Sequence, residues 1–418
     1  MTDPASWGAV ISSPTMHVTS ANLTDLTDPA TPGEDDAFVH ADEVSRCVTE
    51  LARFSKRYKP LLTRSDQEVH LQMYLEGLVS GLERKSIEPI AYAHDVPRRG
   101  LQRFVGEGSW SDDDLRTEMR SHVVDEIGEK DGVLIIDGSG FAKKGENSVG
   151  VKRQWCGRLG KVENCQLGMF LAYSTSRGAA LVDAELYLPK EWAEDDERRA
   201  QTHVPREMEF RTSWKIFDDL LLKHGRHVPH SWIVGDDEFG RPSSFRDRLA
   251  GRGERYLLEV PCNTAVRRPP DWPGRKSKWC SVARRAKRLP TDRWRRITVR
   301  NGEKGPIEVL AYSTRVETKR RTGGAREEVL LIMRTLDESQ TWYFLASRDA
   351  PVDEATLVRV ASHRHRIEEL FATAKGDAGL DHYEVRSFVG WHHHMTLSLL
   401  AVWFLVLEHR RLEKKRLQ

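Results

Sequence analysis

Two aspartates end apolar segments of the kind that form buried strands. Asp137 ends VLIID (133–137) before Gly-Ser-Gly, and Asp236 ends SWIVGD (231–236) before Asp-Glu-Phe-Gly. Carboxylates at the C-terminal ends of neighbouring strands would project side by side from the rim of a sheet. Adjacent carboxylates repel each other and favour a hard divalent cation between them, Mg²⁺ or Mn²⁺. Taken singly, either aspartate is more typical of a turn that follows a strand.

A third carboxylate lies in a helical segment, HRHRIEELFATAK (363–375). Glu368 follows Arg364 by four residues and precedes Lys375 by seven, so the three side chains share one helix face. Glu369 points about 100° away from that face. A single helix face of this kind is more often an exposed surface with ion pairs than a functional site.

The elements that would position these residues change along the chain. Residues 1–40 are rich in Thr, Pro, Asp and Ser and predict a flexible acidic tail. Residues 41–125 have helical periodicity, as in LQMYLEGLVSGLE (71–83), and Ser111 with Asp114 resembles a capping box.

From residue 126 the pattern is that of strands and then of alternating strands and helices. Strands are predicted at 133–137, 153–159, 164–175, 179–188, 231–236 and 255–260, with helices near 207–224 and 243–251. This order predicts a mixed sheet covered by helices. Residues 262–327 look basic and irregular, strands return at 328–335 and 341–347, and helices follow from Asp353.

Charge is distributed unevenly although the net charge is only +2. Residues 1–45 hold eight acidic residues and no Lys or Arg, whereas residues 263–300 hold thirteen Lys and Arg against two Asp. The basic stretch suits a polyanionic partner. The five scattered cysteines form no C-x-x-C pair, which favours reduced thiols in a cytosolic protein. The longest apolar run, 397–407, is too short to cross a membrane and predicts a buried helix.

Several longer segments together carry a resemblance to a known family. They are LVSGLERK (78–85), IIDGSGFAKKGENSVGVKRQWCGRLGKVENCQLGMFLAY (135–173), ELYLPKEWAEDDERR (185–199), VGDDEFG (234–240) and RIEELFATAKGDAGLDHYEVRSFVGWHHH (366–394). In number and order they resemble the cut-and-paste DDE transposases of bacterial insertion sequences, in the group with a β-rich insertion before the last acidic residue. The resemblance spans residues 45 to 408.

By position, the resemblance assigns the metal-binding and catalytic roles to Asp137, Asp236 and Glu368. Arg364 and Lys375 match the basic residues of the signature Y-x2-R-x3-E-x6-K, and Ala361 stands where the signature has Tyr. Asp237 and Glu369 adjoin the assigned acids, and only one residue of each neighbouring pair can face the metal ions. The implied activity is two-metal phosphoryl transfer with Mg²⁺, for which Mn²⁺ can substitute: cleavage of transposon ends, then joining of the 3′-hydroxyl to target DNA.

The implied fold is a ribonuclease H-like α/β sheet interrupted by a β-rich insertion. The 132 residues from Asp236 to Glu368 exceed what a strand and its crossover need, so they must contain the insertion. The expected division is an acidic tail (1–40), a helical DNA-binding domain (41–125), the first part of the core (126–261), the basic insertion (262–350) and the C-terminal helices of the core (351–418).

Several basic residues are candidates for contact with DNA. They are Arg364 and Lys375 of the signature, Lys143 and Lys144 after the first aspartate, and Arg284, Arg285, Lys287 and Arg288 in the basic stretch. Three tryptophans interleave with these cations, at 272, 279 and 294, and suit base stacking, although Trp294 better fits a core position. The adjacent histidines 392–394 cannot share a helix face, so packing or DNA contact is expected there rather than metal ligation.

The expected partner is double-stranded DNA, both the terminal inverted repeats and the target, bound by a homodimer on paired ends in the bacterial cytoplasm, with no membrane association. Two alternatives stay open. One is a transposase-derived DNA-binding protein that does not cleave, and the other is a ribonuclease H-like nuclease without strand transfer. The presence of all three acids favours an active enzyme over the first, and the insertion argues against the second.

Overall fold

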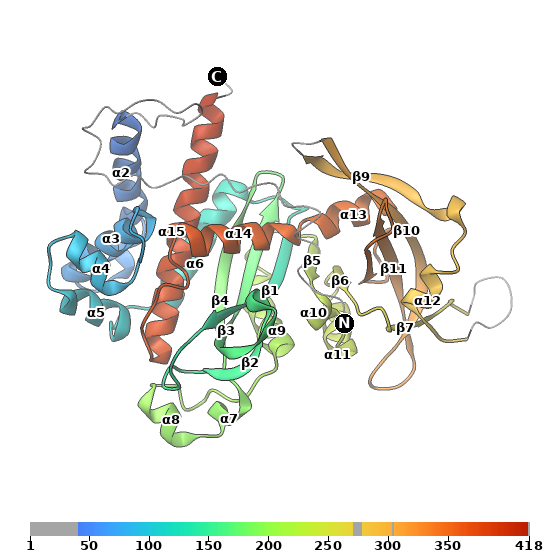
Figure 1. The fold of residues 1–418 in the computed structure, drawn as a ribbon, viewed down its shortest axis with the longest axis horizontal. Helices are drawn as coiled ribbons and strands as arrows, with labels where there is room; N and C mark the ends of the chain where they lie inside the picture. The colour runs from blue at the N-terminus through green and yellow to red at the C-terminus, as the bar shows by residue number, and fades with distance from the viewer. Residues whose placement is uncertain (1–40, 271–277, 303–304, 417–418) are drawn as a thin grey trace.

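The computed structural model describes residues 41–270, 278–302 and 305–416. The acidic tail expected at 1–40 lies outside these ranges. In Figure 1 a mixed sheet occupies the middle of the molecule, with the N-terminal helices and a long C-terminal helix on one side and the β-rich insertion on the other.

The centre of the sheet consists of five strands in the order β4-β3-β1-β5-β6. Their bounds are β1 (Val133–Ala142), β3 (Lys161–Thr175), β4 (Gly178–Tyr187), β5 (Trp232–Gly235) and β6 (Tyr256–Glu259). Strand β3 is antiparallel to both of its neighbours, and β5 and β6 run parallel to β1. This order and these directions are those of a ribonuclease H-like core, as the sequence indicated. A short strand, β2 (Lys152–Cys156), pairs with the beginning of β3.

The prediction that the first strand ends at Asp137 was wrong. Strand β1 pairs in parallel with β5 only as far as Ile136 and Gly235, but its antiparallel pairing with β3 continues to Ala142 and Cys165. Asp137 therefore lies in the middle of β1, at the point where the parallel neighbour ends.

The insertion extends the same sheet. Its elements are β7 (Ala265–Arg267), β8 (Cys280–Ser281), α12 (Val282–Ala286), β9 (Arg295–Gly302), β10 (Gly305–Lys319), β11 (Ala325–Thr335) and β12 (Thr341–Ala346). Strand β12 pairs with β6, which joins the insertion to the core in one twelve-stranded sheet. The interpretation of 262–327 as irregular was wrong, because this segment contains strands β7 to β10. In β10, buried positions alternate with partly exposed ones along much of the strand, and its charged residues lie at the partly or fully exposed positions.

Helices cover this sheet. Their bounds are α2 (Ala41–Lys56), α3 (Ser65–Val79), α4 (Ile87–Ala93), α5 (Arg98–Gly106), α6 (Asp112–Ile127), α7 (Lys190–Ala193), α8 (Asp196–Gln201), α9 (Ser213–His224), α10 (Asp237–Gly240), α11 (Ser243–Gly251), α13 (Glu354–Ser362), α14 (His365–Gly376) and α15 (Phe388–Arg416). Ser111 caps α6 by accepting a hydrogen bond from the Asp114 amide at 3.1 Å. Helix α15 packs on α3, α5, α6 and β4, so the N-terminal helices and the sheet share one hydrophobic core. Among the described residues, no helix is long and apolar enough to span a membrane.

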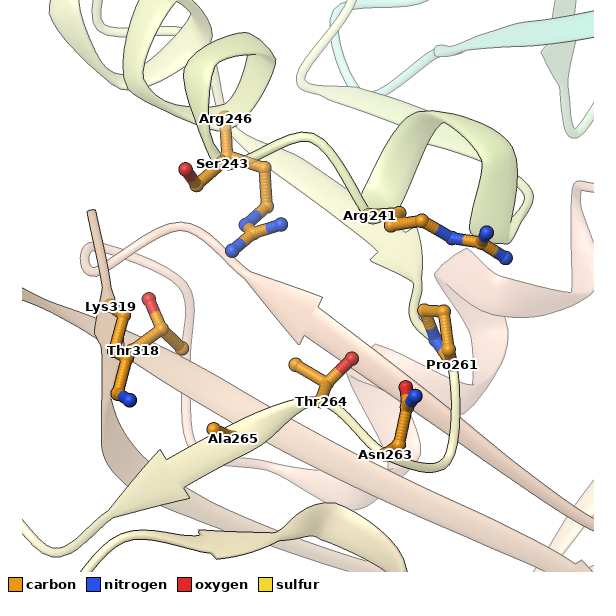
Figure 2. A pocket seen from close by; sticks show the side chains of 9 residues that line it. All are labelled: Arg241, Ser243, Arg246, Pro261, Asn263, Thr264, Ala265, Thr318 and Lys319. Atoms are coloured by element: carbon orange, nitrogen blue, oxygen red, sulfur yellow. The ribbon is translucent and has the colours of Figure 1, made fainter. Parts of the chain in front are cut away.

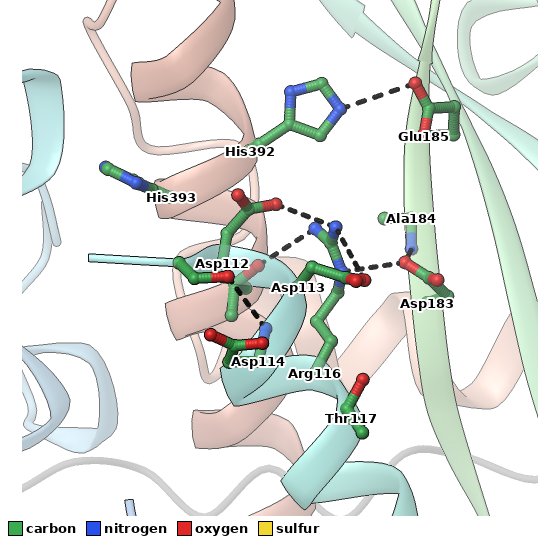
Figure 3. A network of polar contacts seen from close by, with 12 residues as sticks. Asp112, Asp113, Asp114, Arg116, Thr117, Asp183, Ala184, Glu185, His392 and His393 are labelled. Atoms are coloured by element: carbon green, nitrogen blue, oxygen red, sulfur yellow. Dashed lines mark hydrogen bonds and ion pairs between the residues drawn. The ribbon is translucent and has the colours of Figure 1, made fainter. Parts of the chain in front are cut away.

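A buried network of charges ties α6 to the sheet (Figure 3). Arg116 of α6 forms ion pairs with Asp112 at 2.7 Å and with Asp183 of β4 at 2.9 Å. Asp183 also contacts His224 of α9, and both are almost completely buried. Because Asp183 is adjacent in β4 to Ala184, the strand partner of Phe170, it faces the opposite side of the sheet from Asp137.

Candidate active site

Asp137 and Asp236 occupy neighbouring positions of adjacent parallel strands. The last paired residues of β1 and β5 are Ile136 and Gly235, so the two aspartates are the next pair in the same register. Neighbouring strands lie about 4.8 Å apart, and residues in register point to the same face. The structure thus brings the two sequence-predicted aspartates side by side.

A short helix fixes the direction of the second aspartate. Asp236 follows β5 directly and caps α10, where its Oδ1 accepts a hydrogen bond from the Glu238 amide at 3.0 Å. Its neighbour Asp237 instead forms an ion pair with Arg241 at 3.0 Å. Of the two adjacent aspartates, Asp236 is therefore the one that lies beside Asp137.

Helix α14 lies on the same face of the sheet. Its Phe371 packs edge-on against Phe170, the strand partner of Asp137, with 5.1 Å between the ring centroids. Glu368 accepts hydrogen bonds from Arg364 at 3.2 Å and, in the tautomer that donates from Nδ1, from His365 at 3.2 Å. Glu369 shares His365 at 3.5 Å but otherwise pairs with Arg366 at 3.0 Å and with Arg300 of the insertion at 3.5 Å.

Two cations complete the site. Arg364 is 8% exposed, and its Nε is buried without a hydrogen-bond acceptor among the described residues. Lys375, at the other end of α14, donates a hydrogen bond to the Ser139 hydroxyl at 2.7 Å, two residues beyond Asp137 in β1. The two basic residues of the signature therefore stand at opposite ends of α14: Arg364 pairs with Glu368, and Lys375 contacts Ser139 near Asp137.

Burial and mutual repulsion set the protonation of the aspartates. Burial raises the pKa of Asp137 to about 6, with a further increase from Glu368 and an opposing effect of Arg364. Burial and then the charge of Asp137 raise the pKa of Asp236 well above its ordinary value. For Glu368, hydrogen bonds from His365 and Arg364 outweigh burial and lower the pKa. Nearby cations therefore do not fully compensate the negative charge of the aspartate pair, whereas Arg364 and His365 already stabilise the carboxylate of Glu368.

The donor set fits a hard divalent cation. All three side chains offer carboxylate oxygens, the ligands that Mg²⁺ and Mn²⁺ prefer, and a cation would relieve the repulsion between Asp137 and Asp236. In the part of the chain that the structure describes, however, no three acidic, histidine or cysteine side chains converge closely enough to form a cation site. Glu368 accepts hydrogen bonds from Arg364 and His365 instead, although its charge still acts on Asp137.

The structure adds a carboxylate that sequence reasoning missed. Strands β5 and β6 are parallel, with Gly235 opposite Leu258, so Glu259 is in register with Asp236. Gly240 packs so closely on the Glu259 carbonyl that an added Cβ would lie 1.7 Å from it, which seats α10 directly on this residue. The available signal was the strand RYLLEV (255–260), which carries an acid near its end as VLIID and SWIVGD do.

The basic residues proposed to contact DNA differ in their surroundings. Lys143 donates a hydrogen bond to the Tyr383 carbonyl at 3.2 Å and lies 3.3 Å above its ring, and burial lowers the pKa of this lysine to about 8. Lys144 is exposed. In and after α12, Arg284, Lys287 and Arg288 are exposed and Arg285 is half-buried, and within the described ranges none of the four forms an ion pair.

A basic hollow of about 440 Å³ lies where the core meets the insertion (Figure 2). Ser243 and Arg246 line it from the core opposite Thr318 and Lys319 of β10, and Arg241 also lines it. Arg241 and Arg246 are already paired with Asp237 and Glu328, so Lys319 is the lining cation without such a partner among the described residues. Beside it, the ring of Trp279 has Arg267 at 4.7 Å and Lys319 at 5.4 Å.

The other aromatic and histidine candidates are packed inside the protein. Trp294 packs against the smaller core of the insertion and under Arg334, while Trp272 lies outside the described residues. The histidines 392–394 are all buried, and His393 stacks on Trp110 with 3.7 Å between the ring centroids. Packing is therefore their role in the structure.

Two family models match the chain. One, for a DDE superfamily endonuclease, matches residues 57–306, more than half of the 418 residues. The other, for a transposase DDE domain, matches residues 212–404.

Individual relatives match less of the chain. A probable transposase for insertion sequence element IS701 from Microchaete diplosiphon is 35% identical over 89 residues, which cover 21% of this chain and 23% of that protein. A cryo-EM structure of the piggyBac transposase synaptic complex with hairpin DNA aligns with a TM-score of 0.41 at 10% identity, over 88% of this chain and 73% of that one. Because the first family match spans more than half of its residues, the chain belongs to the DDE superfamily endonucleases, as the resemblance of its sequence to DDE transposases indicated.

Proposed function

We propose that this chain is a DNA transposase that cleaves transposon ends and joins the new 3′-hydroxyl to target DNA. The observation that carries the proposal is the register of Asp137 and Asp236 on adjacent parallel strands, with Glu368 on the helix that crosses the same face. The curated relative named as a probable transposase supports the same activity.

Each residue of the site has a role in this proposal. Asp137, Asp236 and Glu368 would hold Mg²⁺, or Mn²⁺ in its place. When bound, the metal ions activate the attacking water or 3′-hydroxyl and stabilise the leaving oxygen. Arg364 neutralises the carboxylates, and Lys375 lies against Ser139, where its ammonium group can meet a DNA phosphate.

This function suggests how the chain is divided into domains. We propose a helical DNA-binding domain at 41–125, a core at 126–261 and 351–418, and a DNA-binding insertion at 262–350, after an acidic tail at 1–40. We further propose that the enzyme acts as a homodimer on paired inverted repeats in the bacterial cytoplasm. The basic hollow and the exposed cations of α12 support contact between DNA and the insertion.

A strand-transfer assay tests the proposal. The full chain is mixed with a labelled terminal inverted repeat, a target plasmid and Mg²⁺, and with the same components in excess chelator. We expect cleaved ends and joined products with Mg²⁺ or Mn²⁺ and neither in chelator. Binding alone would identify a DNA-binding protein, cleavage without joining would identify a nuclease, and full cleavage in chelator would exclude the metal mechanism.

Neutralising the basic side chains of α12 and the residues after it should weaken DNA binding. The variant replaces Arg284, Arg285, Lys287 and Arg288 with Gln. Fewer counterions are released when fewer cations meet phosphates, so the slope of log K against log salt should become shallower by about 0.9 for each lost contact. Fluorescence anisotropy with a labelled duplex at several salt concentrations measures this slope.

Two exposed cations that already have carboxylate partners provide the control. Lys161 pairs with Glu163 at 3.1 Å, and Lys190 pairs with Glu194 at 3.5 Å. Both lie outside the segments proposed to bind DNA, so replacing Lys161 and Lys190 with Gln should leave the slope unchanged. An unchanged slope in the fourfold variant would remove α12 from the DNA interface.

A further inference from the structure

The charges of four carboxylates act on Arg364, one more than the expected metal-binding set. Asp137, Asp236 and Glu259 form a row across β1, β5 and β6, because the registers of both parallel pairs place them at the same level. Residues at one level of a parallel sheet project to the same face. The charges of these three and of Glu368 all act on the Arg364 guanidinium.

Glu259 and Arg364 each have an unused hydrogen-bonding group. Among the described residues, Glu259 receives no hydrogen bond and forms no ion pair through its side chain. The buried Nε of Arg364 likewise has no acceptor, although another nitrogen of the same guanidinium donates to Glu368 at 3.2 Å. A buried donor without an acceptor is unfavourable, so a carboxylate that approaches Arg364 would be stabilised.

Metal binding would change the partners of Arg364. To bind a metal ion together with the two aspartates, Glu368 would exchange its hydrogen bonds with Arg364 and His365 for metal ligation. Arg364 would then keep a buried charge that has lost the one ion pair it forms among the described residues, which is costly. Of the four carboxylates whose charges act on it, Glu259 alone has no role in the metal site.

We infer that Glu259 is a positioning residue: it replaces Glu368 as the carboxylate partner of Arg364 when Glu368 binds the metal ions. The inference rests on the proposed function, because it presupposes that Asp137, Asp236 and Glu368 bind the metal. Groups that hold or release metal ligands in this way typically change metal affinity by about 10- to 100-fold when they are removed.

Binding of Mn²⁺ to the full chain without DNA, followed by electron paramagnetic resonance of the free ion, tests the inference. We expect Glu259→Gln to weaken binding by roughly 10-fold, with partial recovery in Glu259→Asp. Asp237→Asn is the control, because it removes an equal charge beside Glu259 from a side chain that is already paired with Arg241. Equal affinities for wild type and Glu259→Gln, or equal losses in Glu259→Gln and Asp237→Asn, would overturn the inference.

Two further measurements distinguish a positioning role of Glu259 from a structural role and from an error in the proposed metal site. In chelator, the melting temperature of Glu259→Gln should not fall below that of the wild type, because burial opposes the charge of Glu259 and its side chain forms no hydrogen bond or ion pair among the described residues; a clear decrease would mean a structural role and would overturn the inference. Asp137→Asn should bind Mn²⁺ much more weakly than the wild type. If Asp137→Asn binds as the wild type does, the proposed metal site itself is wrong.

Discussion

The Glu368→Gln variant should bind transposon ends normally while cleavage and joining both fall by orders of magnitude. The amide keeps the size and hydrogen bonding of the side chain but removes the charge that would help to hold the metal ions, and both steps would use the same ions. DNA binding should survive because the exposed cations of α12 and the basic hollow lie elsewhere. Gel-shift and single-turnover cleavage assays on one labelled end measure the two properties separately.

Glu369→Gln is the matched control. Glu369 is adjacent in sequence, carries the same charge, is similarly exposed and also contacts His365, but its arginine partners are Arg366 and Arg300 and not Arg364. Its loss should change cleavage only mildly. If the two variants behave in the opposite way, the third ligand is Glu369, and if neither affects cleavage, the third ligand does not lie on α14.

The sequence was sufficient to locate the two aspartates but not the whole row of acids. Asp137 and Asp236 follow apolar segments, so their placement on neighbouring buried strands could be predicted, although Asp137 lies in the middle of β1 and not at its end. Glu259 has the same local pattern, yet an acid at the end of one strand resembles any turn residue until the register of its neighbour is known. Register depends on pairing between segments far apart in the chain, which local pattern does not contain.

Long-range packing also explains why the strands of the insertion and the contacts of the helices could not be fully predicted from the sequence. The length of β10 could not be predicted because charged residues alternate with apolar ones along it, and a strand with one partly exposed face shows no continuous apolar run. Helix α15 was expected as a buried helix. Its contacts with α3, α5 and α6, more than 250 residues earlier, are what join the N-terminal helices to the core.

The Asp183→Asn variant should be destabilised by about 3–5 kcal/mol, because it leaves Arg116 in the interior with a buried charge that has lost its closest partner in the sheet. Arg116 and Asp183 are 5% and 1% exposed in their side chains, so water cannot replace the missing carboxylate. Urea unfolding followed by circular dichroism measures the loss. Asp113→Asn removes a half-exposed carboxylate 3.9 Å from the same arginine and should cost less than about 1 kcal/mol.

The pH dependence of this loss follows from the pKa of Asp183. Burial alone would raise that pKa, but Arg116 and His224 outweigh it and hold the pKa well below the ordinary value. A carboxylate with a lowered pKa in the folded state stabilises the protein above its unfolded pKa of about 3.9, and that contribution disappears as the pH falls toward the folded value. The difference between wild type and Asp183→Asn should therefore stay constant from about pH 8 to pH 5 and shrink only in stronger acid. A difference that disappears near neutral pH would mean that His224, rather than the Arg116 ion pair, determines the stability of this network.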